Sequence, residues 1–224
     1  MMRLGPKRRI VLINPNTDAA ITTAMLEMAR RFAPAPIALQ GVTAARGSAL
    51  IIDPAALSIA AEAVGEIVAG LKPCDGVIVS AFGDPGLKLA RRVLACPVTG
   101  LAEASMAHAA VGGRRFCVVT TTPALASTID DAARAYGHGA SYVGTFCTPG
   151  DPMVMMRDPA LLPIALLETC ERVIAAQGVE AIIIGGGPLA AAARTISGRV
   201  AIPVIEPLRA AMETLAAAMS LQEP

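Results

Sequence analysis

The 224-residue sequence has almost no net charge and no concentration of charge of either sign. Its 19 Lys and Arg residues nearly balance 18 Asp and Glu residues, which leaves a formal charge of +1. A nucleic-acid-binding protein usually carries a basic stripe or patch, and this sequence has none. We therefore expect a small molecule or another protein subunit as its partner, and no nucleic acid.

Long apolar runs are also missing. No run reaches the roughly 18 residues of a membrane-spanning helix. The basic N-terminus, residues 1–9, precedes an apolar stretch at 10–13 that is too short for a signal peptide. The sequence therefore predicts a cytoplasmic protein without membrane contact. Its 54% hydrophobic content, with only 17% charged residues, favours association into a homo-oligomer.

The sequence lacks the motifs of several common sites. Its five cysteines are scattered and form no Cys-x-x-Cys pair, so we expect neither a metal site nor a redox site. It has no phosphate-binding loop ending in Gly-Lys-Ser/Thr and no Gly-x-Gly-x-x-Gly fingerprint, which argues against nucleotide binding. His108 and His138 have no evident carboxylate partner, so a catalytic triad is not indicated.

An internal repeat is the strongest positive feature. Arg8-Arg9, at the start of one apolar run, is matched by Arg114-Arg115 at the start of another, and Pro97-Val98 is matched by Pro203-Val204. Both pairs are 106 residues apart. Two matches at one offset indicate a duplicated unit, and two equivalent halves create a cleft between them.

Short apolar runs alternate with Ala-rich segments, a pattern typical of parallel strands covered by helices. We expect an α/β fold with two similar four-stranded parallel-sheet domains, related by pseudo-two-fold symmetry. The first lobe would comprise residues 1–100 with 205–224, and the second residues 101–204. The expected strands are 9–13, 37–42, 76–80, 95–98, 115–120, 141–145, 180–184 and 201–204. The expected helices are 18–32, 54–71, 86–94, 101–110, 124–136, 159–177 and 207–219.

Polar and glycine-rich loops follow four of these strands at matching positions in the two halves. Ligands of open α/β sheets lie beyond the carboxyl ends of the strands, so these loops are expected to line one site. Ordinary turn chemistry is the alternative, because Asn, Pro, Gly and Asp are common turn residues. The candidate binding residues are Asn14, Asn16, Thr17, Phe82, Thr120, Thr121, Gly186 and Gly187.

The order of the motifs resembles the hydantoin racemase branch of the aspartate/glutamate racemase superfamily. The resemblance is carried by Asn14-Pro15-Asn16-Thr17, by Phe82-Gly83-Asp84-Pro85-Gly86-Leu87, by Pro97-Val98 and by the run that ends at Thr120-Thr121. It implies a cofactor-independent enzyme that acts at the acidic α-carbon of a small carboxylate, an amino acid or a cyclic ureide. It also implies two cysteines on opposite faces of that carbon, one removing the proton and the other supplying one.

The sequence departs from this pattern at both cysteines. Ala81 and Gly186 occupy the two positions, and neither can transfer a proton. Racemisation by two cysteines is therefore not expected. The remaining alternatives are a lyase- or decarboxylase-like enzyme with a different acid and base, a non-catalytic binding paralogue, or replacements introduced to trap a substrate.

Other residues are weaker candidates for the acid or base. Ser80 adjoins Ala81. Asp84 is expected at the cleft mouth, and Cys147 falls in a predicted loop that could overhang the site. Each has an ordinary alternative: an unactivated hydroxyl, a helix cap and an inert thiol. Four further side chains are read as structural, with Glu103 and Glu206 as helix-start carboxylates, His108 as part of a helix and His138 in an exposed turn.

Overall fold

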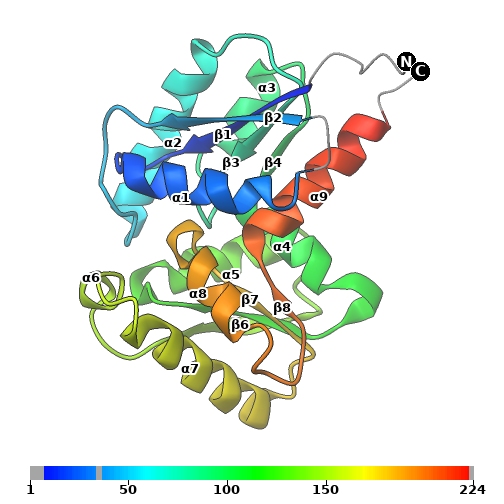
Figure 1. The fold of residues 1–224 in the computed structure, drawn as a ribbon. Helices are drawn as coiled ribbons and strands as arrows, with labels where there is room; N and C mark the ends of the chain where they lie inside the picture. Colours follow the sequence, from blue (N-terminus) through cyan, green and yellow to red (C-terminus); the bar gives the residue numbers. More distant parts are fainter. Residues whose placement is uncertain (1–7, 34–36, 222–224) are drawn as a thin grey trace, which may run out of the picture.

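The computed structural model describes residues 8–33 and 37–221, so the basic segment before Arg8 lies outside the described residues. Strands and helices alternate along the chain and confirm the α/β class (Figure 1). The strands are β1 (Arg8–Asn14), β2 (Ile37–Thr43), β3 (Gly76–Val79), β4 (Val98–Gly100), β5 (Phe116–Thr120), β6 (Tyr142–Cys147), β7 (Ala181–Ile184) and β8 (Val204–Ile205). The helices are α1 (Ala19–Arg30), α2 (Pro54–Ala69), α3 (Leu87–Val93), α4 (Leu101–Ala109), α5 (Ala126–Ala135), α6 (Pro152–Met155), α7 (Leu161–Gln177), α8 (Ala190–Ile196) and α9 (Pro207–Ser220).

The strands form two four-stranded sheets of the same order, β2-β1-β3-β4 and β6-β5-β7-β8, and every pairing is parallel. The central strands are buried along their length, at residues 10–13, 77–79, 116–119 and 181–184. Continuous apolar runs of this kind suit parallel strands that are covered on both faces. The expectation of two similar parallel-sheet units is confirmed.

Two prolines shift the edge strands away from the expected bounds. β4 begins at Val98 and β8 at Val204, each directly after a proline, although the sequence suggested starts at residues 95 and 201. Proline has no N–H to donate to a ladder. The proline carbonyl can still accept a hydrogen bond: Val77 N donates to Pro97 O, and Ile182 N donates to Pro203 O, both at 3.0 Å. Each edge strand therefore begins directly after a proline whose carbonyl accepts the first hydrogen bond.

Nine α-helices occur in the described residues, two more than the sequence suggested. The short helix α6 lies in a loop that was expected to be irregular. The other addition, α8, follows Gly185-Gly186-Gly187-Pro188 and occupies the place in the second half that α3 occupies in the first. The glycine run obscured it, because glycine and proline together usually indicate a turn rather than the approach to a helix.

Helices α4 and α9 lie between the two sheets (Figure 1). A single buried cluster joins Leu12 and Ile78 of the first sheet, Val118 of the second, Met106 of α4 and Met212 of α9. Helix α9 packs against α4, α1, β3 and β4, so the end of the chain returns to the first half. The division of the chain at residue 100 stays a prediction. In the described part of the chain, no helix combines the length and apolar character needed to cross a membrane.

A candidate ligand site between the lobes

A cavity lies between the carboxyl ends of the central strands of the two sheets, which point to the same side of the molecule in Figure 1. It holds about 560 Å³ of empty space, part of it open to solvent. The loops after β1, β3, β5 and β7 all contribute to its wall, as the strand-end rule predicts. Its lining residues are Asn16, Leu50, Ile51, Ser80, Ala81, Phe82, Thr120, Thr121, Thr122, Leu125, Ile129, Met156, Gly185, Gly186, Gly187, Pro188 and Leu189.

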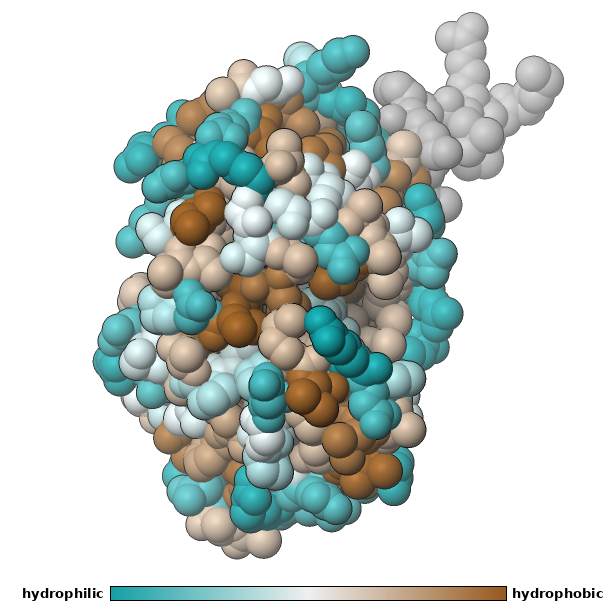
Figure 2. Space-filling model, turned by 90° about the vertical axis from the view of Figure 1, so that its left-hand side faces the viewer, coloured by the Kyte–Doolittle hydropathy of each residue, from teal (hydrophilic) through white to brown (hydrophobic). Residues whose placement is uncertain are grey.

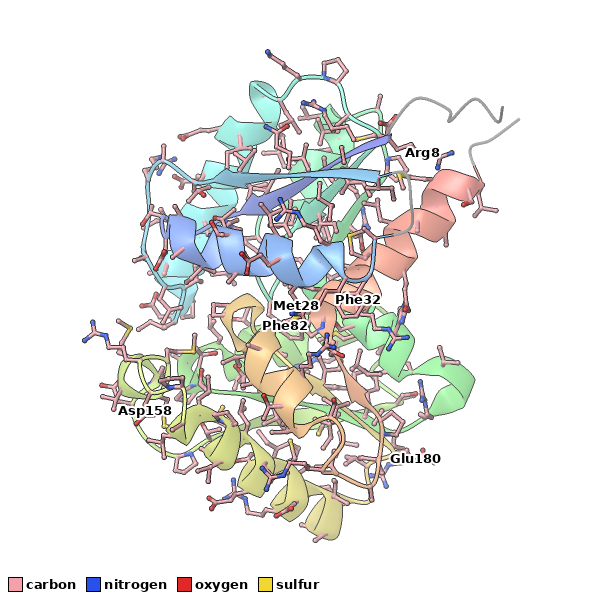
Figure 3. The ribbon with its side chains drawn as sticks, in the orientation of Figure 1. Arg8, Met28, Phe32, Phe82, Asp158 and Glu180 are labelled. Carbon is pink, nitrogen blue, oxygen red and sulfur yellow. The ribbon has the colours of Figure 1, made fainter. Side chains whose placement is uncertain are left out.

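Eight of the residues singled out from the sequence line this cavity. They are Asn16, Ser80, Ala81, Phe82, Thr120, Thr121, Gly186 and Gly187. In Figure 3, the labelled Phe82 lies where the two lobes meet, below α1. Their role in binding stays a prediction. The apolar wall at Leu50 and Ile51 was not predicted from the sequence. The loop after β2 begins at the same edge of the sheet, so the strand-end rule could have included it.

Four other candidates do not belong to the described cavity lining: Asn14, Thr17, Asp84 and Cys147. Asn14 is fully buried and holds the first loop in place. Its Nδ2 donates to Asn16 Oδ1 at 2.7 Å and to Thr22 Oγ1 at 2.9 Å, and its Oδ1 accepts from Asn16 N at 3.2 Å. Asn14 therefore positions Asn16 instead of facing the cavity.

Ala81 and Gly186 occupy equivalent places in the two lobes, although they are 105 rather than 106 residues apart. Each lies two residues beyond the last residue of its strand, Val79 of β3 or Ile184 of β7. Ser80 N donates to Ile13 O at 2.8 Å in the first lobe, and Gly185 N donates to Val119 O at 2.9 Å in the second. The second half is one residue shorter between its two central strands, which accounts for the difference in offset.

The described cavity lining is mostly apolar, with a few polar side chains and no charged one. None of the described lining residues is Asp, Glu, His, Cys, Lys, Arg or Tyr. Ser80 is buried, and its Oγ has no hydrogen-bond partner within the described structure. By contrast, Thr120 Oγ1 already donates to Gly185 O at 2.8 Å. Ser80 is therefore a buried hydroxyl in the wall that remains available to a ligand.

The glycine loop after β7 is pressed against the first lobe. A Cβ at Gly187 would lie 2.7 Å from Met25 Sδ and 3.2 Å from the carbonyl oxygen of Ser80. At Gly186 the backbone has φ +152°, which L-residues with a side chain rarely adopt, and a Cβ would lie 3.0 Å from Leu189. The loop is thus shaped for glycine.

Asp84 caps α4 and connects the two lobes. Its carboxylate accepts from Ala102 N at 2.9 Å and from Glu103 N at 2.8 Å, both at the N-terminus of the helix. Tyr136 follows α5 in the second lobe, and its hydroxyl donates to Asp84 Oδ2 at 2.9 Å. Glu103 in turn pairs with Arg91. The geometry thus engages Asp84 as a helix cap.

Burial raises the pKa of Asp84 from 3.8 to about 6, although its three hydrogen bonds act in the opposite direction. A carboxyl whose pKa is higher in the folded state stabilises the fold fully below its unfolded pKa, and this contribution is lost as the pH rises through its folded pKa. The unfolding free energy of the wild type should therefore fall between about pH 4 and pH 6, relative to Asp84→Asn, by about 3 kcal/mol. Urea denaturation across this range measures the difference, and parallel pH profiles would contradict it.

The thiol and imidazole candidates lie elsewhere. Burial, and then the negative charge of Asp130, raises the pKa of Cys147, which makes its thiol less reactive at neutral pH. His108 does have a carboxylate partner, since its Nδ1 lies 3.6 Å from Glu213 Oε2. His138 is only partly exposed and packs edge-on against Phe116, with ring centroids 5.9 Å apart. The expectation of an unpartnered His108 is therefore corrected, whereas His138 does lie in an exposed turn, with its side chain partly covered.

No group of three His, Cys, Asp or Glu side chains gathers as a metal site would require, in the part of the chain that the structure describes. The cysteines do show one proximity that their spacing did not suggest. Cys74 Sγ and Cys96 Sγ lie 3.7 Å apart, in the loops that precede β3 and β4. These loops lie at the amino ends of the strands, so the pair is at the edge of the sheet opposite the cavity.

Two similar parallel α/β lobes, with a small uncharged cavity between their strand ends, define a two-lobed α/β protein with an interlobe ligand site. Residues 10–215 match the Asp/Glu/Hydantoin racemase family. The chain belongs to this family.

Individual relatives agree with the family match. A hydantoin racemase from Pseudomonas sp. (strain NS671) is 30% identical over 201 residues, covering 88% of this chain and 80% of the relative. The allantoin racemase structure from Klebsiella pneumoniae has a TM-score of 0.89 at 31% identity, covering 96% of this chain and 89% of the other. The allantoin racemase structure from Pseudomonas fluorescens has a TM-score of 0.90 at 27% identity, with 95% and 91% covered.

Proposed function

We propose that the interlobe cavity binds a small cyclic ureide, and that this family member is a binding protein without two-cysteine racemisation. The observation that carries the proposal is the absence of any titratable side chain among the described residues that line the cavity. Transfer of a proton from an α-carbon needs a positioned acid or base with a pKa near the working pH. The methyl group of Ala81 and the bare backbone of Gly186 supply neither.

The chemistry of the wall supports an uncharged ligand. A buried carboxylate without a cationic partner is strongly disfavoured, and no cation belongs to the described lining. Hydroxyl and amide side chains such as Ser80 and Asn16 can both donate and accept hydrogen bonds. A cyclic ureide presents alternating N–H and C=O groups, which match such a wall. Hydantoin and allantoin, after which the relatives above are named, are both cyclic ureides.

Asn16 supports the same ligand class. Its Oδ1 accepts from Asn14 Nδ2 and from Asp18 N at 3.0 Å, which leaves its amide NH₂ as a donor for a ligand carbonyl. Ser80 Oγ can then accept from a ring N–H or donate to a second carbonyl. The two side chains come from the loops after β1 and β3.

A second candidate is an enzyme that acts at the acidic α-carbon with a different acid or base, as a lyase or a one-base exchange enzyme would. One observation favours it, namely the unpartnered Ser80 Oγ next to Ala81. A serine hydroxyl needs an adjacent base to become reactive. The described lining offers no such base, so the binding protein is the better-supported function.

Enantiopure 5-methylhydantoin tests both candidates. We expect it to raise the thermal unfolding midpoint, and we expect Ser80→Ala to weaken its binding about 5- to 10-fold through the loss of one hydrogen bond. The exposed Ser220→Ala serves as the matched control and should bind as the wild type does. In deuterated water, proton NMR should show α-proton loss no faster than in buffer. Accelerated loss that Ser80→Ala abolishes would establish the enzyme, and the absence of hydantoin binding would refute the ureide site.

A further inference from the structure

A second cavity lies near the connections between the lobes, on the side of α4 and α9, and none of its lining residues belongs to the interlobe site. It holds about 750 Å³ of empty space, part of it open to solvent. Both chain connections between the lobes contribute to its wall: Val111 and Arg114 lie between α4 and β5, and Glu206 lies between β8 and α9. The β8–α9 connection is visible in the middle of Figure 1.

In the described wall of this cavity, some charged side chains form ion pairs and two do not. Glu213 is compensated, since Arg209 Nε donates to its Oε1 at 2.8 Å and His108 Nδ1 lies 3.6 Å from its Oε2. Arg114 and Glu206 form no ion pair among the described residues, although, after the hydrogen bond to Glu213, the charge of Glu206 also helps to raise the pKa of Arg209 in the same wall. One Arg114 guanidinium nitrogen, Nη2, donates to the carbonyl oxygen of His108 at 2.6 Å, so the side chain is held in place.

Each of these two side chains, Arg114 and Glu206, also has a buried polar atom without a hydrogen-bond partner in the described structure: Arg114 Nε and Glu206 Oε2. Most buried polar groups are hydrogen-bonded, and each exception calls for an explanation. The two atoms are a donor on a cation and an acceptor on an anion. They lie on opposite connections of the chain, and both residues line the same cavity.

We propose that this cavity binds a small zwitterion of the α-amino acid class, with its carboxylate toward Arg114 and its ammonium toward Glu206. One ligand of this kind supplies an acceptor for Arg114 Nε and a donor for Glu206 Oε2, whereas a simple anion or cation supplies only one of the two. Val111, Ile205 and Ala210 complete the wall and offer a small side chain an apolar surface. A bound amino acid would bridge the α4–β5 and β8–α9 segments and stabilise the arrangement of the lobes.

L-alanine is the probe for this site, and isothermal titration calorimetry measures its binding. We expect binding that is at least ten-fold tighter than that of acetate or methylammonium chloride, which each carry one of the two charges. Arg114→Gln and Glu206→Gln should each weaken alanine binding at least ten-fold. The exposed Arg30→Gln and Glu27→Gln serve as matched controls and should bind alanine as the wild type does.

Three further results decide the proposal. Ser80→Ala should leave alanine binding unchanged, and a loss there would place the amino acid in the interlobe cavity and overturn the second site. Equal binding of acetate, methylammonium and alanine would overturn the zwitterion. The cavity could instead contact a second copy of the chain. In that case sedimentation would show concentration-dependent association, weakened by Glu206→Gln, with no alanine binding, and this result would also overturn the proposal.

Discussion

Asp84→Ala is expected to lower the free energy of unfolding by about 4 kcal/mol, because it leaves three buried donors without an acceptor. The donors are Ala102 N, Glu103 N and the Tyr136 hydroxyl. Asp84 also has φ +51°, a left-handed conformation that aspartate tolerates better than alanine does. Chemical denaturation at pH 7 measures the loss.

Two companion variants separate the cap from a general effect of mutation. Tyr136→Phe removes one donor together with its hydrogen bond and should cost about 1 kcal/mol, since no donor is left unpaired. Gly100→Ala keeps Asp84 but places a Cβ against its carboxyl group, so it should disturb the same cap from the other side. A wild-type-like unfolding free energy for Asp84→Ala would show that α4 does not depend on this carboxylate.

Asp84 shows how a sequence motif can be interpreted in two ways. The Phe-Gly-Asp-Pro-Gly-Leu sequence places a titratable side chain near a strand end, which indicates an acid or base as readily as a cap. Only the fold brings the N-terminus of α4 and Tyr136 to the carboxylate, and these partners are 18 and 52 residues away along the chain. Contacts over such separations leave no local pattern, so the sequence left both readings open.

The fold itself was largely accessible from the sequence, because parallel strands buried on both faces leave uninterrupted apolar runs. The repeat at Arg8 and Arg114 and at Pro97 and Pro203 then predicted two equal sheets, as found. The misses have local causes. Prolines moved the starts of β4 and β8, and a glycine run obscured α8.

The sequence predicted where the candidate site lies, but not how polar and charged groups are arranged around it. The strand-end rule located Asn16, Ser80 and Thr121 on one cavity wall. It could not show that internal hydrogen bonds engage Asn14, nor that Arg114 and Glu206 both line a second cavity.

Hydrophobic side chains also gather around the level where the lobes meet, on the face shown in Figure 2. A groove there is lined by Met25, Met28, Met153 and Met156 and adjoins the interlobe cavity.

Ala81→Cys combined with Gly186→Cys is expected to raise the rate of α-proton exchange of 5-methylhydantoin from the buffer background by at least about 100-fold, the usual range for a positioned acid or base. The two loops place these positions equivalently, each two residues beyond a central strand and each on the cavity wall. Deuterium exchange by proton NMR and optical rotation are followed on the same sample.

The single variants distinguish exchange on one face of the α-carbon from inversion. With a thiol only at position 81, the proton leaves and returns on one face, so exchange should occur while optical rotation is retained. Gly186→Cys introduces strain, because of φ +152° and the 3.0 Å approach to Leu189, and should destabilise the fold by about 1–3 kcal/mol. Inversion therefore requires both thiols, and the loop after β7 must tolerate the Gly186→Cys substitution. A folded double variant that binds 5-methylhydantoin without exchanging its α-proton would show that the two positions do not flank the α-carbon.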